Sequence, residues 1–386
     1  MKVVIVGGGF AGVKAALELK NKAGIEVELI SKHADFEYHS ALYRTATGHS
    51  PLEVVFRLGD LFKSAKNVEV VLDKIVALNT KVKAVKGESG QVYRYDKLLL
   101  CMGNEKNFYQ IPGLDTYAHT MYTIRDTIDL RGQLTELFRV PHSSRVRVIV
   151  IGAGASGVEL CGDLQHYARE VAQRYTTKQK TLEIELIEGG PRVLPLLSEK
   201  ASEKARKRLQ KIGVLVRLNS IVLECGQNIV KLSDEERAAD IIIWTAGSKN
   251  VDFFAKYPEV FELERGKVRV GEHLSIPKAP DVFVLGDNAL TPYSGMAQTA
   301  LYDAAYVAKY IHFLSQATSS KSFIPYKVKK PIYAIPIGTG WAVVDNGKKV
   351  RSGRVGWLIR RRADSYMMKN FEPYKKAFVS WYKKVS

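Results

Sequence analysis

Two short glycine-rich segments carry the strongest chemical signal in this chain. Residues 7–12 and 152–157 both read G-x-G-x-x-G, and each directly follows an apolar run, at 3–6 and 146–151. In this motif the first glycine permits a tight turn, the second lets the backbone approach a pyrophosphate, and the third lets a helix pack against the strand. The pyrophosphate then lies at the positive end of the helix dipole. Two such segments predict two bound dinucleotides, with electron transfer between them.

Each of these units should also contain a group that hydrogen-bonds a ribose, at the end of its second strand. In the second unit this group is Glu188, whose carboxylate favours NAD because it repels the 2′-phosphate of NADP. In the first unit the position is Ser31, followed by Lys32, and a hydroxyl bonds a ribose more weakly than a carboxylate does. A glutamate that is merely exposed at a strand end is the plain alternative for Glu188.

A late Gly286-Asp287 pair follows the buried run 282–285 and precedes an expected helix at 296–314. In a protein with two dinucleotides, this position suits contact with the ribityl and phosphate part of a flavin. The alternative is a plain turn aspartate.

The elements that must position these residues follow from hydrophobic periodicity. Strands are predicted at 2–6 and 26–31 around a helix at 10–22, and strands at 146–151 and 182–188 around a helix at 155–175. Alternation over 68–100 predicts a small antiparallel meander. The fold class is therefore α/β, with two Rossmann-like dinucleotide-binding domains. The predicted division is a discontinuous first domain at 1–112 and 265–322, a second domain at 113–264, and a C-terminal β segment with amphipathic basic helices at 323–386.

Composition narrows the class of protein. The chain has 386 residues and a formal net charge of +18, and residues 348–386 contain twelve Lys or Arg and two acids. Such an excess attracts an anionic surface, either membrane or nucleic acid. We find no apolar stretch long enough to span a bilayer and no signal peptide before the first strand, so a cytoplasmic location is expected. The three dispersed cysteines predict neither a dithiol centre nor a metal site.

At this point the sequence resembles a known family, the type II NADH:quinone oxidoreductases, which are non-proton-pumping NADH dehydrogenases within the two-dinucleotide-binding flavoproteins. The resemblance covers the chain nearly end to end. It is carried by residues 6–12, 42–48, 152–159, 187–195, 244–247, 286–287, 297–300, 337–343 and 356–358. The paired glycine motifs specify the superfamily, and the Ala297-Gln298 segment with the aromatic tail specifies the family.

The resemblance implies the cofactors and their contacts. FAD is expected on the first glycine loop and the late Gly-Asp pair, and NADH on the second loop. Hydride would pass from the nicotinamide to the flavin, and two electrons from the flavin to a quinone. The FAD contacts are expected to be Gly7, Gly9, Phe10, Ala11, Gly12, Ser31, Lys32, Gly103, Gly286, Asp287, Ala297 and Gln298. The NAD contacts are expected to be Gly152, Gly154, Ala155, Ser156, Gly157, Glu159, Glu188 and Gly247.

Four residues are implied to act at the reacting end of the flavin. Glu159 matches a glutamate that the family places near the flavin and nicotinamide, where it could stabilise or relay a proton; favourable placement near a helix start is its alternative role. Gln298 belongs to the family's Ala-Gln-x-Ala-x-Gln-Gln segment. In this chain Tyr302 and Asp303 replace the final glutamine pair. A tyrosine could donate to a quinone oxygen and a carboxylate could take part in protonation.

The C-terminal residues 354–386 match the family's membrane-docking segment in position. An aromatic stripe flanked by lysines, with a basic run at 360–362, predicts salt-sensitive peripheral binding to the cytoplasmic face of an anionic membrane. Packing on the protein's own core or in a homodimer is the alternative for this segment.

Other functions stay open. The same enzyme could use oxygen, ferredoxin or another small carrier as acceptor. A redox-sensing flavoprotein could bind nucleic acid or a protein through its basic surface, although the helical aromatic stripe favours a membrane over nucleic acid. An NAD-binding module without turnover is the least favoured.

Overall fold

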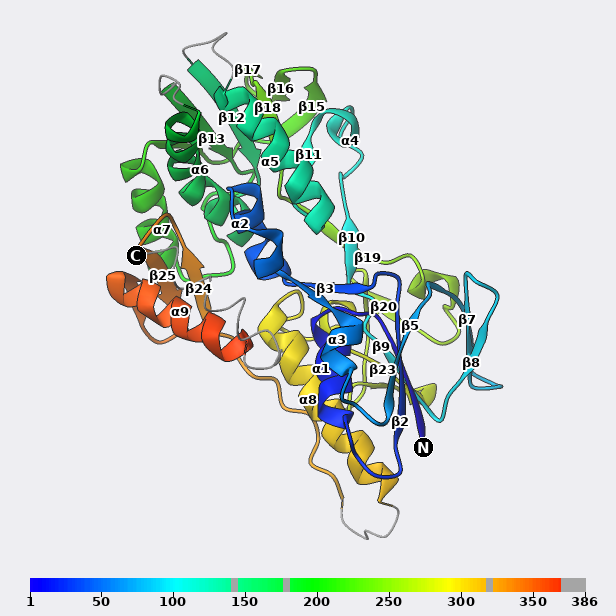
Figure 1. Cartoon of the computed structure of the whole chain (residues 1–386). Coiled ribbons are helices and arrows are strands. Elements are labelled where there is room, and N and C mark those ends of the chain that lie inside the picture. The colour runs from blue at the N-terminus through cyan, green and yellow to red at the C-terminus, as the bar shows by residue number, and fades with distance from the viewer. Residues whose placement is uncertain (140–144, 176–180, 317–321, 369–386) are drawn as a thin grey trace.

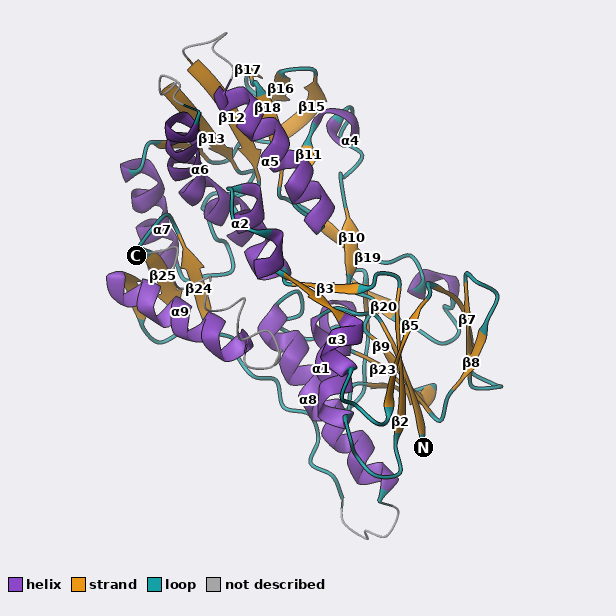
Figure 2. Ribbon diagram, in the orientation of Figure 1, coloured by secondary structure: helices purple, strands orange, loops and turns teal. Residues whose placement is uncertain are grey.

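The computed structural model describes residues 1–139, 145–175, 181–316 and 322–368. Two parallel sheets with helices against them form two lobes (Figure 1), and short antiparallel sheets are attached to each (Figure 2). The first sheet has, in spatial order, β22 (Ser275–Ile276), β23 (Ala279–Val284), β9 (Lys97–Leu100), β1 (Lys2–Val6), β2 (Glu26–Ser31) and β5 (Val68–Leu72). The predicted opening β-α-β unit is confirmed, because β1, α1 (Phe10–Leu19) and β2 follow one another and the strands pair in parallel.

The centre of the first sheet is apolar on both faces. β1 lies between β2 and β9, and residues 3–6 are buried. On one face, α1 packs against α8 (Ala297–Ser315) through small side chains. These are Ala11, Ala15, Ala300, Ala304 and Ala308. Because alanine side chains are small, the two helices can approach closely, and the start of α8 lies next to the first glycine loop.

The expected meander over 68–100 is wrong at its first strand. β5 (Val68–Leu72) pairs in parallel with β2 at the edge of the large sheet. The antiparallel meander consists of β6 (Ile75–Asn79), β7 (Ala84–Gly87) and β8 (Val92–Arg94). An edge strand is half exposed and alternates like a meander strand, so its pattern did not distinguish the two.

The second sheet repeats the arrangement. Its order is β11 (His119–Thr120), β18 (Ile241–Trp244), β12 (Arg145–Ile151), β13 (Thr181–Ile187) and β14 (Val214–Arg217), all parallel. The helices α5 (Ile124–Arg139), α6 (Ala155–Arg174) and α7 (Glu199–Lys211) pack against it. The second predicted unit, strand, helix and strand, is therefore confirmed.

The two lobes are joined by a strand pair that sequence analysis did not predict. β10 (Asn104–Lys106) leaves the first sheet and pairs antiparallel with β19 (Ser248–Asn250), which leaves the second. The crossing lies a few residues before the domain boundary predicted after residue 112, where Gly113 has a positive φ of 72°. The division of the chain at residues 112 and 264 stays a prediction.

The C-terminal part begins with a small antiparallel sheet. It consists of β24 (Tyr333–Pro336), β25 (Ala342–Asp345) and β26 (Val350–Gly353), and α9 (Arg354–Met368) packs across it. The part of the predicted amphipathic basic helices that follows residue 368 lies outside the described residues. In the described ranges, no helix combines the length and the apolar character needed to cross a membrane.

Candidate dinucleotide and acceptor sites

The first glycine loop connects β1 to α1, and its three glycines have different environments. Gly7 has φ +116°, where a side chain would be strained, and an added Cβ would lie 2.1 Å from the carbonyl oxygen of Cys101. A Cβ on Gly12 would lie 1.9 Å from the carbonyl oxygen of Gly7. A Cβ on Gly9 would meet no atom within 4 Å. The first and third glycines are thus needed for the turn and the helix contact, whereas the second faces open space.

The second loop, between β12 and α6, has the same three environments. Gly152 has φ +103°, a Cβ on Gly157 would lie 2.0 Å from the carbonyl oxygen of Gly152, and Gly154 faces open space. The open space lies at a helix N-terminus in both loops, where backbone N–H groups and the helix dipole favour an anion. Both loops therefore fit a pyrophosphate.

The two side chains predicted to contact a ribose have different hydrogen-bond partners. The Oε2 of Glu188 accepts a hydrogen bond from the amide of Ala153 at 2.8 Å, and Oε1 accepts from the amide of Gly190 at 2.9 Å. The hydroxyl of Ser31 instead donates to the carbonyl of His33 at 2.7 Å, and it lies beside Gly8. Both side chains are next to their glycine loops, and the role of each toward a ribose stays a prediction.

The late Gly-Asp pair lies against the first loop. Gly286 has φ +66°, and an added Cβ would lie 3.4 Å from the Cβ of Ala11. The carboxylate of Asp287 accepts from the side-chain amide of Asn104 at 2.9 Å, and burial raises the pKa of Asp287. A half-buried carboxylate beside an open phosphate cradle fits contact with the sugar-like chain of a flavin, which offers hydroxyl donors.

The remaining predicted cofactor residues lie around these two loops. Phe10 and Ala11 begin α1, and the Phe10 ring packs against Phe36 and Tyr38 at centroid distances of 5.1 and 5.4 Å. Ala155 and Ser156 begin α6, and Ala297 begins α8. Lys32 is exposed. Gly103 and Gly247 both have positive φ, and they lie just before β10 and just before β19.

The residues expected at the acceptor end are held by contacts within the chain. The Gln298 side chain donates to the carbonyl of Ile332 at 2.8 Å and accepts from its amide at 3.1 Å. The half-buried Tyr302 ring lies 5.8 Å from the Tyr326 ring. Asp303 is fully buried, and burial raises its pKa to about 6. Only part of this set therefore faces solvent, and its role toward an acceptor stays a prediction.

Glu159 lies in a buried ionic cluster. It is 5% exposed, and Arg360 Nη1 from α9 lies 3.1 Å from its Oε1. Arg360 Nε also lies 3.0 Å from Asp364, and its guanidinium donates to the carbonyls of Ala334 and Ser40. Burial raises the pKa of Glu159 to about 8, although the nearby guanidinium acts to lower it. Since Glu159 lies beyond the first turn of α6, the helix-start alternative is not supported.

Arg360 is the clearest functional residue that the sequence prediction misplaced. We expected the basic run 360–362 to face a membrane, but the Arg360 side chain is only 12% exposed and is cationic between two carboxylates. A signal was present in the helical spacing. Arg360 shares one face of α9 with three buried residues, which are Gly356, Asp364 and Met367. An Arg and an Asp four residues apart on that face indicate an internal ion pair.

Asn288 was also missed. Its side chain is completely buried, accepts from the amide of Gly103 at 3.0 Å and donates to the carbonyl of the same residue at 2.6 Å. The amide thus fastens the loop that starts the interlobe crossing. Its place directly after Asp287 is the signal that could have found it.

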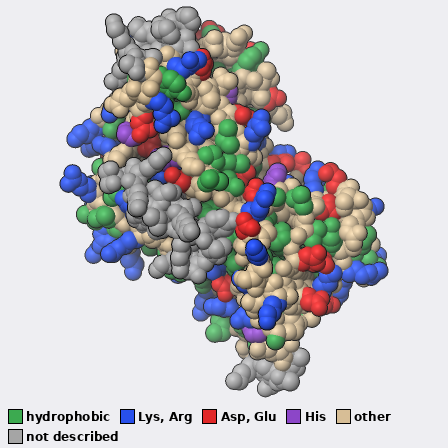
Figure 3. Space-filling model, viewed as in Figure 1, with side chains coloured by type: hydrophobic (Ala, Val, Ile, Leu, Met, Phe, Trp, Pro, Cys, Tyr) green, Lys and Arg blue, Asp and Glu red, His purple; other side chains and the backbone are tan. Residues whose placement is uncertain are grey.

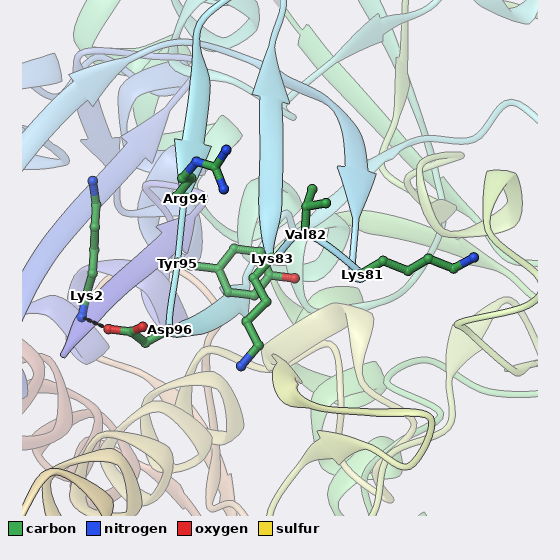
Figure 4. A pocket seen from close by; sticks show the side chains of 7 residues that line it. All are labelled: Lys2, Lys81, Val82, Lys83, Arg94, Tyr95 and Asp96. Carbon is green, nitrogen blue, oxygen red and sulfur yellow. Dashed lines mark hydrogen bonds between the residues drawn. The ribbon is translucent and has the colours of Figure 1, made fainter.

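A basic depression of about 420 Å³ lies elsewhere (Figure 4). Its lining residues are Lys2, Lys81, Val82, Lys83, Arg94, Tyr95 and Asp96. Lys2 begins β1, so the depression lies at the amino ends of the strands. Dinucleotides bind outside the carboxyl ends, where both glycine loops are. The depression is therefore separate from the candidate site.

Comparison with known proteins agrees with this geometry. Residues 1–307 match the model of a family described as pyridine nucleotide-disulphide oxidoreductase. The chain belongs to the pyridine nucleotide-disulphide oxidoreductase family. Its three cysteines are nevertheless free and buried. Membership makes this protein an oxidoreductase with a nucleotide-binding α/β fold.

Relatives within this family bear the names expected from the sequence. The chain is 30% identical over 383 residues to the type II NADH:quinone oxidoreductase Ndh of Mycobacterium tuberculosis, covering 93% of this chain and 82% of the relative. The family resemblance drawn from the sequence is thus confirmed.

Solved structures share the fold. NDH2 from Plasmodium falciparum, in complex with NADH, superposes with a TM-score of 0.86 at 17% identity and covers 98% of this chain and 96% of its own. The sulfide:quinone oxidoreductase from Aquifex aeolicus superposes at 0.81 with 16% identity, over 100% of this chain and 96% of its own. At these identities the likeness establishes the fold alone.

Proposed function

We propose that this protein is an FAD-dependent NADH:quinone oxidoreductase that works on a membrane surface without pumping protons. The observation that carries the proposal is the pair of glycine loops with open space at Gly9 and Gly154. Two phosphate cradles on one chain fit two dinucleotides. The names of the relatives contain NADH, which supports NADH as one of them, and the family resemblance implies FAD as the other. When bound, the flavin takes a hydride from NADH and delivers two electrons to a quinone.

FAD would bind at the first loop. The backbone N–H groups at the start of α1 would hold its pyrophosphate, and the half-buried carboxylate of Asp287 would accept from ribityl hydroxyls. Ser31 would contact the adenosine ribose weakly, because its hydroxyl already donates to the carbonyl of His33.

NADH would bind at the second loop. Glu188 would accept from ribose hydroxyls, and it would exclude NADPH because a 2′-phosphate would lie against its negative charge. Gly247 lies at the carboxyl end of β18, on the same sheet edge as the second loop. Its positive φ lets the chain turn toward that loop.

Glu159 would supply or hold a proton near the reacting atoms. With its pKa raised to about 8, the carboxyl group is largely protonated at neutral pH. Arg360 limits this rise, since a nearby cation stabilises the charged form. The residue can therefore release or take up a proton close to the working pH, which is what an acid-base group requires.

A quinone would approach at the start of α8, where Gln298 and Tyr302 lie. The Tyr302 hydroxyl would donate to a quinone oxygen. Asp303 is enclosed below this surface, so we assign it no direct contact with the acceptor.

The outer face of α9 would contact an anionic membrane. Val355, Leu358 and Tyr366 are exposed on one side of this helix, with Arg362 among them. Lys and Arg side chains gather on the edge formed by α7 and α9 (Figure 3). An exposed apolar stripe beside cations binds a bilayer interface, and each cation near the surface adds about 1 kcal/mol.

The proposal is tested with purified protein in an anaerobic cuvette. The flavin spectrum is recorded, NADH is added, and a short-chain quinone follows. We expect bleaching by NADH and rapid return of colour with quinone. Absence of a flavin spectrum overturns the first site, and bleaching without return overturns the quinone assignment.

A second acceptor class is kept because of Gln298. Both polar groups of its side chain are bonded to Ile332, which leaves fewer groups for a quinone than the family motif offers. A flavoprotein reductase that uses oxygen, ferredoxin or a small carrier fits this arrangement. The same cuvette separates them, because reduced flavin would then be reoxidised by that acceptor and not by quinone.

A further inference from the structure

Residues 322–332, here called the strap, lie along one face of α8. The strap has no helix or strand of its own and runs beside the helix (Figure 1). Its contacts fall on side chains of α8 at helical spacing, namely Gln298, Tyr302, Tyr306, Tyr310 and Phe313. Most are contacts between aromatic rings, which hold the strap through apolar packing.

One contact of the strap extends into the protein interior. The hydroxyl of Tyr326 donates to Asp303 Oδ1 at 2.6 Å. The other oxygen, Oδ2, accepts from the backbone amide of Gly286 at 3.1 Å. Asp303 is completely buried and Tyr326 is half-buried, so the bond to Gly286 forms in the interior and the bond to Tyr326 at its edge. A charged acceptor with two donors is among the stronger hydrogen-bonded arrangements in proteins.

Gly286 is confined on its other sides as well. Its φ of +66° is one that side chains rarely adopt, and an added Cβ would lie 3.3 Å from the Cβ of Ala300. The hydrogen bond from the Gly286 amide to Asp303 fixes the orientation of the Leu285–Gly286 peptide, one residue before Asp287. The direction of the Asp287 side chain depends on how this peptide is oriented. Asp287 is the carboxylate assigned to the flavin, so flavin binding depends on the same orientation.

We propose that Asp303 and Tyr326 are positioning residues for the flavin, acting through the Gly286–Asp287 turn, and that the strap is thereby coupled to flavin binding. The inference rests on the proposed function, which assigns the flavin to the first glycine loop. It also explains a departure from the family motif. A carboxylate accepts at both oxygens at once, whereas the amide of a glutamine accepts at one only.

The variants that separate positioning from simple packing follow from this geometry. Asp303→Ala leaves the buried Gly286 amide and the half-buried Tyr326 hydroxyl without this partner. Asp303→Asn can keep both contacts, because its oxygen accepts from Gly286 and its NH₂ donates to the tyrosine oxygen. Tyr326→Phe removes one donor only.

A matched control exists on α8, where Tyr306 bonds another residue of the strap. The hydroxyl of Tyr306 donates to the carbonyl of Ile324 at 2.8 Å and bonds His273 Nδ1 at 2.6 Å. Tyr306→Phe therefore removes a strap hydrogen bond without touching Asp303 or Gly286.

The experiment measures flavin retention in each full-length variant. Flavin-to-protein ratio is read from the absorption spectrum, and the dissociation constant from the recovery of free-flavin fluorescence on dilution. We expect Asp303→Ala to weaken flavin binding about tenfold or more, the effect of losing one charged hydrogen bond. Asp303→Asn should stay within about threefold, Tyr326→Phe should fall between them, and Tyr306→Phe should match the wild type.

A second readout follows the strap itself. Amide hydrogen exchange over 322–332 should slow when flavin is added to the flavin-free wild type, and this slowing should be lost in Tyr326→Phe. Equal flavin affinity in Tyr326→Phe and Tyr306→Phe, with equal exchange, would overturn the inference. If Asp303→Ala does not fold, the Tyr326→Phe and Tyr306→Phe pair decides alone. Wild-type protein that binds no flavin would overturn the proposed function as well, whereas flavin-loaded wild type with unaffected variants overturns this inference only.

Discussion

The two glycine loops have nearly the same local geometry, but they are held in place differently. Each has a first glycine with positive φ and a third glycine that touches the carbonyl oxygen of the first. The second loop is braced by Glu188, 35 residues away, through the amide of Ala153. The first lies against a turn that is held by Asn288 and Asp303, late in the chain. The motif is local in both units, whereas the bracing is local in only one.

The two loops depend on different carboxylates, a half-buried one beside the second loop and a fully buried one near the first. The second loop is braced by a carboxylate that is also suited to a ribose, so one side chain can serve both roles. In the first unit the hydroxyl of Ser31 is bonded within its own turn. The buried hydrogen bonds beside this loop are instead made by Asn288 and Asp303. The second unit has one long-range contact of its own. Glu159 on α6 is paired with Arg360 on α9, late in the chain.

The largest effect on stability is expected when the contact between Glu159 and Arg360 is removed. Arg360→Ala leaves the buried Asp364 carboxylate without its cation and Glu159 without its hydrogen-bond donor, and breaking a buried pair in this way costs about 3 to 5 kcal/mol. Arg362→Ala, on the exposed side of α9, should change the free energy of unfolding by about 0.5 kcal/mol or less. Denaturant unfolding of both variants measures this difference. Similar stability of the two variants would show that the cluster does not secure α9.

The equivalence of the two loops is tested by alanine substitution at matching glycines. Gly12→Ala and Gly157→Ala place a Cβ against a carbonyl oxygen, and such overpacking costs about 3 kcal/mol. Gly9→Ala and Gly154→Ala place it in open space, and the backbone at Gly9, with φ −88°, accepts alanine. These two variants should keep the wild-type melting temperature but lose flavin and NADH binding, respectively. Loss of stability at Gly9 would contradict the open cradle.

The sequence predicted the loops well because their geometry is encoded locally. Apolar runs before each glycine motif and the helix after it set the turn, so Gly7 and Gly152 lie where expected. The bracing residues could not be predicted in the same way. Asp303 bonds Gly286 and Asn288 bonds Gly103, across separations of 17 and 185 residues. The place of Asn288 next to Asp287 draws attention to the residue, but no local pattern shows its partner.

Charge runs were the least reliable signal. The run 360–362 reads as a basic surface, yet burial depends on which face of α9 meets β24 to β26, and only the spacing of Arg360 and Asp364 records that. β5 shows the same ambiguity, because an alternating strand can lie at a sheet edge or in a meander.

The Glu159 cluster predicts a pH dependence of stability with a definite sign. Its pKa is raised from an ordinary value of 4.5 to about 8, so the folded state binds the proton more tightly than the unfolded state. The contribution is present below pH 4.5 and is lost as the pH rises toward 8, at no more than about 1.4 kcal/mol per pH unit. Unfolding of wild type and Glu159→Gln across this window isolates the effect. A difference between them that does not change with pH would contradict a raised pKa.

The sharpest test of the comparison makes the second unit resemble the first. Glu188→Ser replaces the bracing carboxylate by the residue type that Ser31 provides in the first loop. We expect the KM for NADH to rise about tenfold and the preference over NADPH to fall, since one charged hydrogen-bond acceptor and one repulsive charge are lost together. Flavin content should not change, because the first loop is braced independently.

Glu188→Gln separates the two effects of this substitution. It keeps an oxygen that can accept from the amide of Ala153, so it should hold the loop while removing the charge. Discrimination against NADPH should therefore fall in both variants, whereas the KM for NADH should rise mainly in Glu188→Ser. If both variants bind NADH like the wild type, the bracing of the second loop does not depend on this side chain, and the two units are held alike.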